Sequence, residues 1–262
     1  MLKIATWNVN SIRIRIEHLA QLVKEENPDI LCLQEVKAKE DDFPFAAIRS
    51  LGFPHIALYS IPGYNGVAIL SKEPFRHEEK HRRVARDDAR HISVVVRNDI
   101  ELHNIYIPAG GNIPDINTNP SFQHKLQFVD ELSCFFEQRK ETKKIICGDF
   151  NIAPLENDVW NHQSMLKIIS HTPIEIEKLL SLYKRGKFYD ITRRIYPDSQ
   201  KVYSWWSYRN PNWQTNNKGR RLDHIWCSRD IINLVENVTI RNDFRSLERP
   251  SDHVPVIATL NI

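Results

Sequence analysis

The segments Leu2-Lys-Ile-Ala-Thr-Trp-Asn8 and Asp29-Ile-Leu-Cys-Leu-Gln-Glu35 decide the fold class. The first alternates in polarity, which is typical of a β-strand, and ends on an amide. The second is continuously apolar, which predicts a strand buried on both faces, and ends on a carboxylate. Between them, apolar residues recur at helical spacing from Ile12 to Val23, with Ser11 suited to be the N-cap and Pro28 ending the helix. The first fifty residues therefore predict strand, helix, strand, helix.

Further along the chain the predicted strands follow one another more closely. They are expected at 55–59, 66–71, 91–97, 101–107, 144–148, 202–206, 221–227, 235–240 and 254–260. A breaker-rich loop at 108–120 precedes an amphipathic helix at 121–139, and 161–189 is expected to be mostly helical. This pattern favours two packed sheets over one doubly wound sheet. We expect an α/β fold, a four-layer α/β-sandwich of two mainly antiparallel sheets flanked by helices, in one domain spanning residues 1–262.

Composition narrows the class of protein. The 262 residues are 41% hydrophobic and 26% charged, with a net charge of +3, which supports a polyanionic partner only weakly. Basic clusters at 77–83 and 184–187 could contact phosphates, although composition alone favours solvated loops. The four cysteines are scattered and lack the spacing of a zinc site. No signal peptide or apolar span is recognisable, so we expect a cytoplasmic monomer that does not bind membranes.

Polar side chains stand where predicted strands end. Asn8, Glu35, Asp149 and Asn151 follow apolar runs, and Asp252 directly precedes one. A single aspartate in such a place is more often a turn former. Strand ends of a packed sheet, however, bring distant side chains to one edge, and Mg²⁺ prefers oxygen ligands. Because bare carboxylates would repel a polyanion, this pattern predicts a metal-dependent site.

Seven segments carry a resemblance to a known family. They are Ala5-Thr-Trp-Asn-Val-Asn-Ser-Ile-Arg13, Leu33-Gln-Glu-Val-Lys37, Gly63-Tyr-Asn-Gly-Val-Ala-Ile-Leu-Ser71, Asn104-Ile-Tyr-Ile-Pro108, Gly148-Asp-Phe-Asn-Ile-Ala-Pro154, Arg221-Leu-Asp-His-Ile225 and Arg249-Pro-Ser-Asp-His-Val-Pro255. In this order they resemble the exonuclease III family of DNA-repair nucleases, the class II apurinic/apyrimidinic endonucleases of the endonuclease/exonuclease/phosphatase superfamily. The resemblance covers essentially the whole chain.

The resemblance implies a Mg²⁺ site, with Mn²⁺ as an alternative. Glu35 would be the principal ligand, with Asn8 and Asp252 nearby. The full set of implied metal contacts is Asn8, Glu35, Asp149, Asn151, Asp252 and His253.

Catalytic roles are implied in the same way. Asp149 would activate or orient the attacking water, and Asn151 would hold that water or a phosphate oxygen. His253 would stabilise the transition state, and Asp223 would fix its tautomer through the other ring nitrogen. Tyr106 would contact the phosphate through its hydroxyl. Taken singly, Tyr106 could instead be an interior aromatic and Asp223 an ordinary salt-bridge partner.

Substrate contacts are the third implied group. They are Arg90, Trp205, Trp206, Asn217 and Leu222, with Trp205 at a wall of the pocket that takes the baseless sugar. Because Trp205 and Trp206 are adjacent in an expected strand, their side chains would point to opposite faces. At most one of the two therefore needs to pack in the core. The sequence departs from the family pattern at Arg220, where an apolar pocket residue is usual, and at Ala109, where relatives often place an amide.

The implied activity is incision of duplex DNA 5′ to abasic sites and removal of 3′-blocking groups or nucleotides, a 3′-to-5′ exodeoxyribonuclease. The partner would be double-stranded DNA with abasic sites or 3′ ends. One alternative is another phosphodiesterase or phosphatase of the same superfamily. A catalytically silent DNA-binding module is the other, but it predicts the loss of a central residue such as Glu35 or His253, and none is lost.

Overall fold

The computed structural model describes residues 1–140, 142–210 and 212–262. The first sheet contains β1 (Leu2–Asn8), β2 (Ile30–Gln34), β3 (His55–Ile61), β4 (Tyr64–Ser71), β11 (Val235–Ile240) and β12 (Val256–Leu260). The second contains β5 (Arg76–Lys80), β6 (His91–Val96), β7 (Ile100–Tyr106), β8 (Lys144–Asp149), β9 (Phe188–Asp190) and β10 (Asp223–Ser228). Their orders are β11-β12-β1-β2-β4-β3 and β5-β6-β7-β8-β10-β9.

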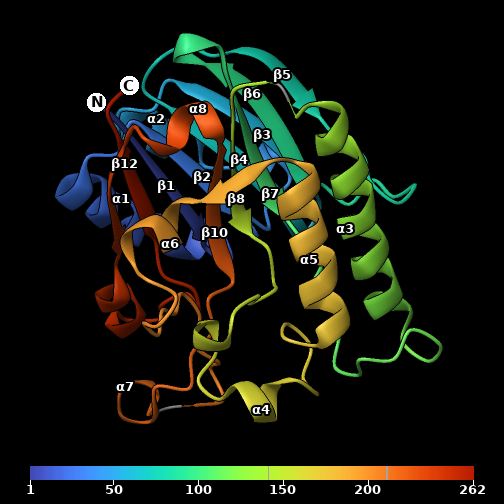
Figure 1. Cartoon of the computed structure of the whole chain (residues 1–262). Helices are drawn as coiled ribbons and strands as arrows, with labels where there is room; N and C mark the ends of the chain where they lie inside the picture. Colours follow the sequence, from blue (N-terminus) through green and yellow to red (C-terminus); the bar gives the residue numbers. More distant parts are fainter. Residues whose placement is uncertain (141, 211) are drawn as a thin grey trace.

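Each sheet contains one parallel pair among antiparallel neighbours. These pairs are β1–β2 and β7–β8. The first strand pairs on its other side with the last, with Leu2 opposite Leu260, and the two chain ends lie together at the upper left of Figure 1. The expected pair of mainly antiparallel sheets is confirmed.

Helices cover the outer faces of both sheets. The helices are α1 (Ile12–Glu26), α2 (Phe45–Ser50), α3 (Pro120–Gln138), α4 (His162–Met165), α5 (Pro173–Arg185), α6 (Ile191–Ile195), α7 (Trp213–Asn216) and α8 (Arg229–Ile232). Helices α3 and α5 lie side by side against the second sheet, and α1 lies on the opposite side of the molecule (Figure 1). In the part of the chain described, no helix has the length and apolarity needed to cross a membrane.

Three apolar layers hold this arrangement together. Between the sheets, side chains such as Ile4, Cys32 and Cys147 are fully buried, and both thiols are free. A second layer packs α1 and α2 against the first sheet. The third packs α3 and α5 against the second sheet through residues such as Phe128 and Leu179. The four-layer sandwich expected from the sequence is therefore present.

Capping residues fix where the outer helices begin. Asn119 accepts hydrogen bonds from the backbone of the first turn of α3, and Thr172 forms a capping box with Glu175 at the start of α5. Ser11 occupies the N-cap position of α1 as predicted, but its side chain makes no capping bond and its φ is 88°. The sequence located that helix start correctly and assigned the serine the wrong role.

One predicted strand is absent. Residues 202–206 form no strand, and Trp205 takes part only in isolated bridges to Arg220 and His253. The backbone NH of Trp206 donates to Asp252, so this segment bonds to loops on two sides and not to a continuous ladder. The short strands β5 and β9 were not expected, and β9 ends the region predicted to be mostly helical.

Candidate active site

The sheet topology brings the polar strand ends to one edge of the sandwich. Asn8 ends β1, Glu35 follows β2, Tyr106 ends β7, Asp149 ends β8, and Asp223 begins β10 opposite Asp149. These ends point toward the loops that carry α4 and α7 (Figure 1). Central strands of both sheets therefore contribute to a single site.

Gly148 allows the β8 carboxylate to reach this edge. Its φ is +140°, and an added Cβ would lie 1.9 Å from the carbonyl oxygen of Ile105 in the neighbouring strand. Such a distance is impossible, so only glycine permits β8 to pass β7 this closely. The next residue, Asp149, is then held 1% exposed at the strand end.

Asn8 connects the two central carboxylates. Its Nδ2 donates to Oε1 of Glu35 at 3.1 Å and to Oδ2 of Asp149 at 2.9 Å. The hydroxyl of Tyr106 donates to the same Glu35 oxygen at 2.6 Å. The other Glu35 oxygen lies 2.6 Å from Nζ of Lys37. Glu35 is thus oriented by three neighbours and already accommodates a cation.

His253 is held between two aspartates. Its Nδ1 donates to Oδ2 of Asp223 at 2.8 Å, and its Nε2 lies 3.6 Å from Oδ2 of Asp149. Ser204 also donates to Oδ2 of Asp223, at 2.6 Å. The predicted contact between Asp223 and the ring of His253 is therefore present in the structure.

Asn151 is fixed beside Asp149 by a short turn. Its backbone NH donates to Oδ1 of Asp149 at 2.9 Å, and its Nδ2 donates to the carbonyl of Ile107 at 2.9 Å and to Oδ2 of Asp149 at 3.1 Å. Its φ of 52° is unusual for a residue other than glycine. Glu35 and Asn10 share such φ values, at 50° and 44°. Backbone conformations of this kind concentrate at functional sites.

The electrostatic surroundings give the three ionisable groups different charges. Burial raises the pKa of Asp149 to about 7, and Asp223 and Glu35 act in the same direction. Burial alone would lower the pKa of His253, but Asp223 and Asp149 outweigh it and raise that pKa to about 10. Burial also disfavours the ionised form of Glu35, yet Lys37 outweighs it and lowers the pKa. At neutral pH the site therefore holds an imidazolium, an ionised Glu35 and an aspartate able to exchange a proton.

These oxygen donors suit a hard divalent cation. Glu35 and Asp149 supply carboxylates at the centre, and Asp252 supplies a third at the rim of the same cavity. The ammonium of Lys37, bound to Glu35, shows that positive charge is accommodated there. The donor set fits the divalent metal predicted from the sequence.

A cavity of about 470 Å³ opens beside this cluster. Its lining comprises Glu35, Ala109, Gly111, Asn112, Asp149, Asn151, Ile168, Ile169, Ser170, Trp205, Ser207, Arg209, Arg220, Leu222, Asp252 and His253. Nε1 of Trp205 donates to Oδ2 of Asp252 at 2.9 Å, which fixes the indole at the cavity wall. Trp205 and Leu222 thus line this cavity, and part of the 108–120 loop joins them.

Three residues predicted to contact substrate lie elsewhere. Trp206 is 2% exposed in the core behind the first sheet, and its Nε1 donates to Oδ1 of Asn217 at 3.0 Å. Asn217 therefore supports a core tryptophan and does not line the catalytic cavity. Arg90 is buried in an ion pair with Asp88, and its guanidinium lies 4.5 Å from the ring centroid of Tyr106. Its contact is with a site residue and not with the cavity.

Sequence reasoning overlooked several residues that complete the site. Lys37 and Ser204 bind Glu35 and Asp223 directly. Lys125, fully buried on α3, donates to the carbonyl of Asn151 at 2.8 Å. The adjacency of Lys37 to Glu35 in the sequence could have revealed the first, but the others depend on contacts between distant segments.

Another group of potential metal ligands lies on the outer face of the second sheet. His91 and His103 stand on the neighbouring strands β6 and β7, and His81, which directly follows β5, lies close to both. Nε2 of His91 and Nδ1 of His103 are hydrogen-bonded at 3.0 Å, and Arg83 contacts the other nitrogen of His91 at 3.1 Å. Ring nitrogens that already form hydrogen bonds, and that lie beside a positively charged arginine, are poorly placed to bind a metal cation. The cluster at the strand ends is the better metal candidate.

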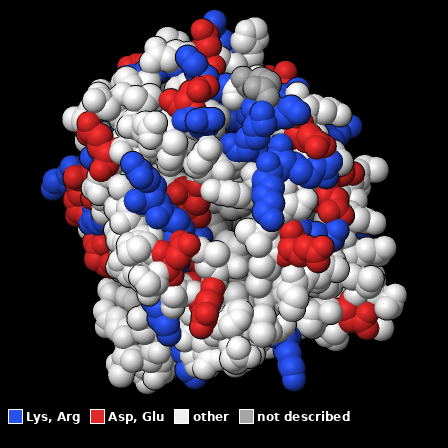
Figure 2. Space-filling model, in the orientation of Figure 1, with Lys and Arg blue, Asp and Glu red and all other residues white. Residues whose placement is uncertain are grey.

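The basic cluster at 184–187 lies far from this site. Lys184 and Lys187 line a surface hollow with Lys140, Arg229 and Ser228, the last residue of β10. Figure 2 shows lysine and arginine side chains gathered in the upper part of this face. Ser228 and Asp223 stand at opposite ends of β10. At roughly 3.3 Å per strand residue, the hollow beside Ser228 therefore lies about 16 Å from the catalytic end of this strand. Lys184 and Lys187 do not line the cavity beside His253.

A charged histidine, paired aspartates and oxygen ligands for a divalent metal, at the shared edge of two stacked sheets, define a class of enzymes that cleave phosphate esters. Comparison with protein families matches residues 5–253 to the Endonuclease/Exonuclease/phosphatase family. The chain belongs to this family, and within it to the exonuclease III group.

Individual relatives match all or nearly all of the chain. Exodeoxyribonuclease III of Haemophilus influenzae is 28% identical, over 98% of this chain and 99% of that protein. An AP endonuclease from Archaeoglobus fulgidus has a similar structure, with a TM-score of 0.92, 29% identity and complete coverage of both chains. A 3′ phosphatase from Neisseria, solved bound to a product DNA hairpin, is also similar in structure, with a TM-score of 0.92, 30% identity and complete coverage of both chains.

Proposed function

We propose that the chain is a Mg²⁺-dependent DNA-repair phosphodiesterase, with Mn²⁺ as an alternative metal. It incises duplex DNA 5′ to abasic sites and removes 3′-blocking groups or nucleotides. The observation that carries this proposal is that one cavity joins Glu35, Asp149 and His253 to the wall formed by Trp205 and Leu222. Relatives named as an exodeoxyribonuclease, an AP endonuclease and a DNA-bound 3′ phosphatase support the choice of DNA as substrate.

Glu35 would hold the metal, with Asn8, Asp149 and Asp252 close by. Bound there, the metal would neutralise phosphate charge and stabilise the leaving oxygen. Asn8 donates to both central carboxylates and so keeps them together against their mutual repulsion. On binding, the metal ion would displace the ammonium of Lys37 from the carboxylate of Glu35.

Asp149 is the proposed base. Its carboxylate is held by Asn8 and by both the backbone and the side chain of Asn151, and its pKa of about 7 suits acceptance of a proton from water near neutral pH. Asn151 would orient that water or a phosphate oxygen. Held in this way, the carboxylate would orient the attacking water for in-line attack on phosphorus.

His253 is the proposed stabiliser of the transition state. Its charge is maintained by Asp223, so Nε2 can donate to a non-bridging phosphate oxygen as negative charge develops. Tyr106 keeps its hydroxyl on Glu35 and would act through that carboxylate, or turn to the phosphate when the metal is bound. Trp205 and Leu222 would form the wall facing an extruded sugar.

The test uses a labelled duplex with one internal abasic analogue, incubated with Mg²⁺ or with EDTA. We expect metal-dependent incision 5′ to the lesion, abolished in Asp149→Asn and His253→Ala. Hydrolysis of a non-nucleic phosphodiester without any DNA incision would instead favour another phosphodiesterase of the family. Binding of the duplex without cleavage under any metal would favour a silent DNA-binding module.

A further inference from the structure

Arg220 forms part of the wall of the catalytic cavity. Its guanidinium carbon lies 4.8 Å from the ring centroid of Trp205, and Nη1 donates to the carbonyl of Ile169 at 3.1 Å and to Oγ of Ser170 at 2.9 Å. The backbones of Arg220 and Trp205 also bond in both directions at 3.0 Å. The charged group is therefore fixed in place and not free to leave the wall.

This cation has no ionic partner in the described parts of the chain. No carboxylate there lies within ion-pair distance of Arg220, and its Nε and Nη2 have no hydrogen-bond partner. The acid that acts on it from a distance, Glu175, is bound by Lys125 at 2.5 Å. The next residue, Arg221, is 1% exposed and pairs with Asp158 at 2.6 Å and Asp190 at 2.7 Å, whereas Arg220 is only partly buried. The contrast identifies Arg220 as an uncompensated charge.

Burial lowers the pKa of Arg220 to about 10, which still leaves the guanidinium charged at neutral pH. A partly buried guanidinium without a direct counter-charge keeps donors available to a ligand, and an anion entering the cavity would pair with it. Arg220 lies in one cavity with Asp149 and His253.

The chemistry of the two candidate reactions differs at this wall. In incision 5′ to an abasic site, the oxygen of the scissile phosphate that faces the pocket carries a neutral, baseless sugar. In a 3′-phosphate end the same oxygen is unsubstituted, and the phosphate carries a second negative charge. Only the second substrate supplies an anion to Arg220.

We propose that Arg220 makes this cavity selective for DNA 3′ ends that carry a phosphomonoester, over internal abasic sites. The proposal rests on the proposed function and names its substrate class. Water attacks phosphorus, the bond between phosphorus and O3′ breaks, and a proton passes to O3′. The products are a 3′-hydroxyl and inorganic phosphate. Arg220 would bind the added charge through Nη2 and Nε, and Trp205 would hold the guanidinium plane by stacking.

The experiment compares two duplexes under Mg²⁺, one with a gap bordered by a 3′-phosphate and one with an internal abasic analogue. In Arg220→Met, which removes the charge and keeps an unbranched chain, we expect kcat/KM for the 3′-phosphate to fall about tenfold or more. Incision at the abasic analogue should change by a clearly smaller factor, so that the ratio of the two kcat/KM values falls. Arg220→Lys should retain most of the preference, and Arg220→Gln, which can still donate to Ile169 and Ser170, should lose it.

Arg209 provides a matched control, because it lines the same cavity but is exposed at its mouth. Arg209→Met should weaken both reactions to a similar extent. An equal change of both reactions in Arg220→Met and Arg220→Gln, with folded proteins, would overturn the specificity role and leave the proposed function standing. Wild-type protein inactive on both duplexes would instead overturn the proposed function and this inference with it.

Discussion

Replacing Asp223 by asparagine removes the carboxylate on which the charge of His253 depends. The two side chains are joined at 2.8 Å and are 1% and 4% exposed. A hydrogen bond to a charged partner contributes about 1.5–3 kcal/mol, and one pKa unit corresponds to about 1.4 kcal/mol. The pKa of His253, about 10 in the native site, should therefore fall by about one to two units in Asp223→Asn.

The same shift has a consequence for stability. Because the folded-state pKa of His253 lies above its ordinary value of 6.5, the charged imidazole stabilises the fold fully below that pH. The contribution is lost as the pH rises through the folded-state pKa. In Asp223→Asn this loss should be complete at a lower pH than in the wild type.

The assay is an NMR titration of the His253 imidazole in metal-free protein, with EDTA present, together with urea unfolding at neutral and alkaline pH. Ser204→Ala is the control, since it removes a second donor to Asp223 at 2.6 Å but keeps the carboxylate. It should leave the imidazole pKa nearly constant. If His253 titrates at the same pH in Asp223→Asn as in the wild type, the electrostatic argument is refuted.

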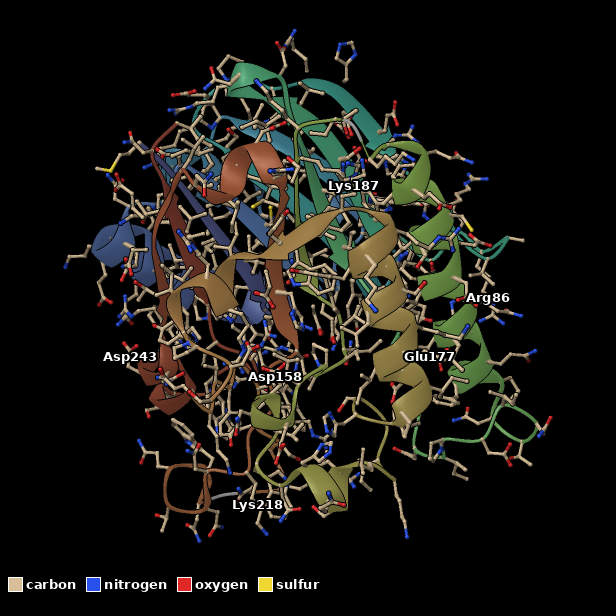
Figure 3. All side chains as sticks on the ribbon, viewed as in Figure 1. Arg86, Asp158, Glu177, Lys187, Lys218 and Asp243 are labelled. Carbon is tan, nitrogen blue, oxygen red and sulfur yellow. The ribbon has the colours of Figure 1, made fainter. Side chains whose placement is uncertain are left out.

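Three further predictions follow from the fold and the metal site. Gly148→Ala would place a Cβ 1.9 Å from a carbonyl oxygen of β7, so we expect the free energy of unfolding in urea to fall by more than about 3 kcal/mol. Near-native stability would contradict this. Asp158→Asn removes a buried carboxylate paired with two arginines and should cost about 3–5 kcal/mol, whereas Asp243→Asn, at the outer edge in Figure 3, should cost less than about 1 kcal/mol. Equal effects would refute the comparison. Burial opposes the charge of Asp158, but its arginines lower the pKa, so its stabilisation is present at neutral pH and lost as the pH falls through the folded-state pKa. Glu35→Gln should weaken Mn²⁺ binding, measured by calorimetry, at least about tenfold, and unchanged affinity would exclude Glu35 as a ligand.

Much of the fold could be predicted because apolar periodicity is local information. The strands around Leu2–Asn8 and Val235–Ile240 and the helix Pro120–Gln138 follow from spacing alone. The segment 202–206 has strand-like composition, yet its backbone groups bond to loops. Its conformation depends on partners that spacing does not specify.

The candidate site was predicted unevenly for the same reason. Asp223 and His253 meet as the motifs implied. Trp206 was expected to contact substrate, but its neighbour Trp205 takes the cavity wall, and Trp206 packs in the core with Asn217 bound to it. A rotation of the backbone decides which of two adjacent side chains faces the core and which faces the cavity. Local composition does not reveal this direction.

By itself, the sequence determined most of the strands along the chain and the kind of chemistry at their ends, because apolar runs and the oxygen atoms after them are properties of short segments. Only the tertiary structure decided which of those groups touch. Asn8 reaches Asp149 across 141 residues of chain at 2.9 Å because β1 and β8 are central strands of facing sheets. The tertiary structure also pairs Arg221 with two aspartates, whereas Arg220 lies in the cavity without such an ion pair among the described residues. Two adjacent arginines look alike in a sequence, and only packing determines which of them has a partner.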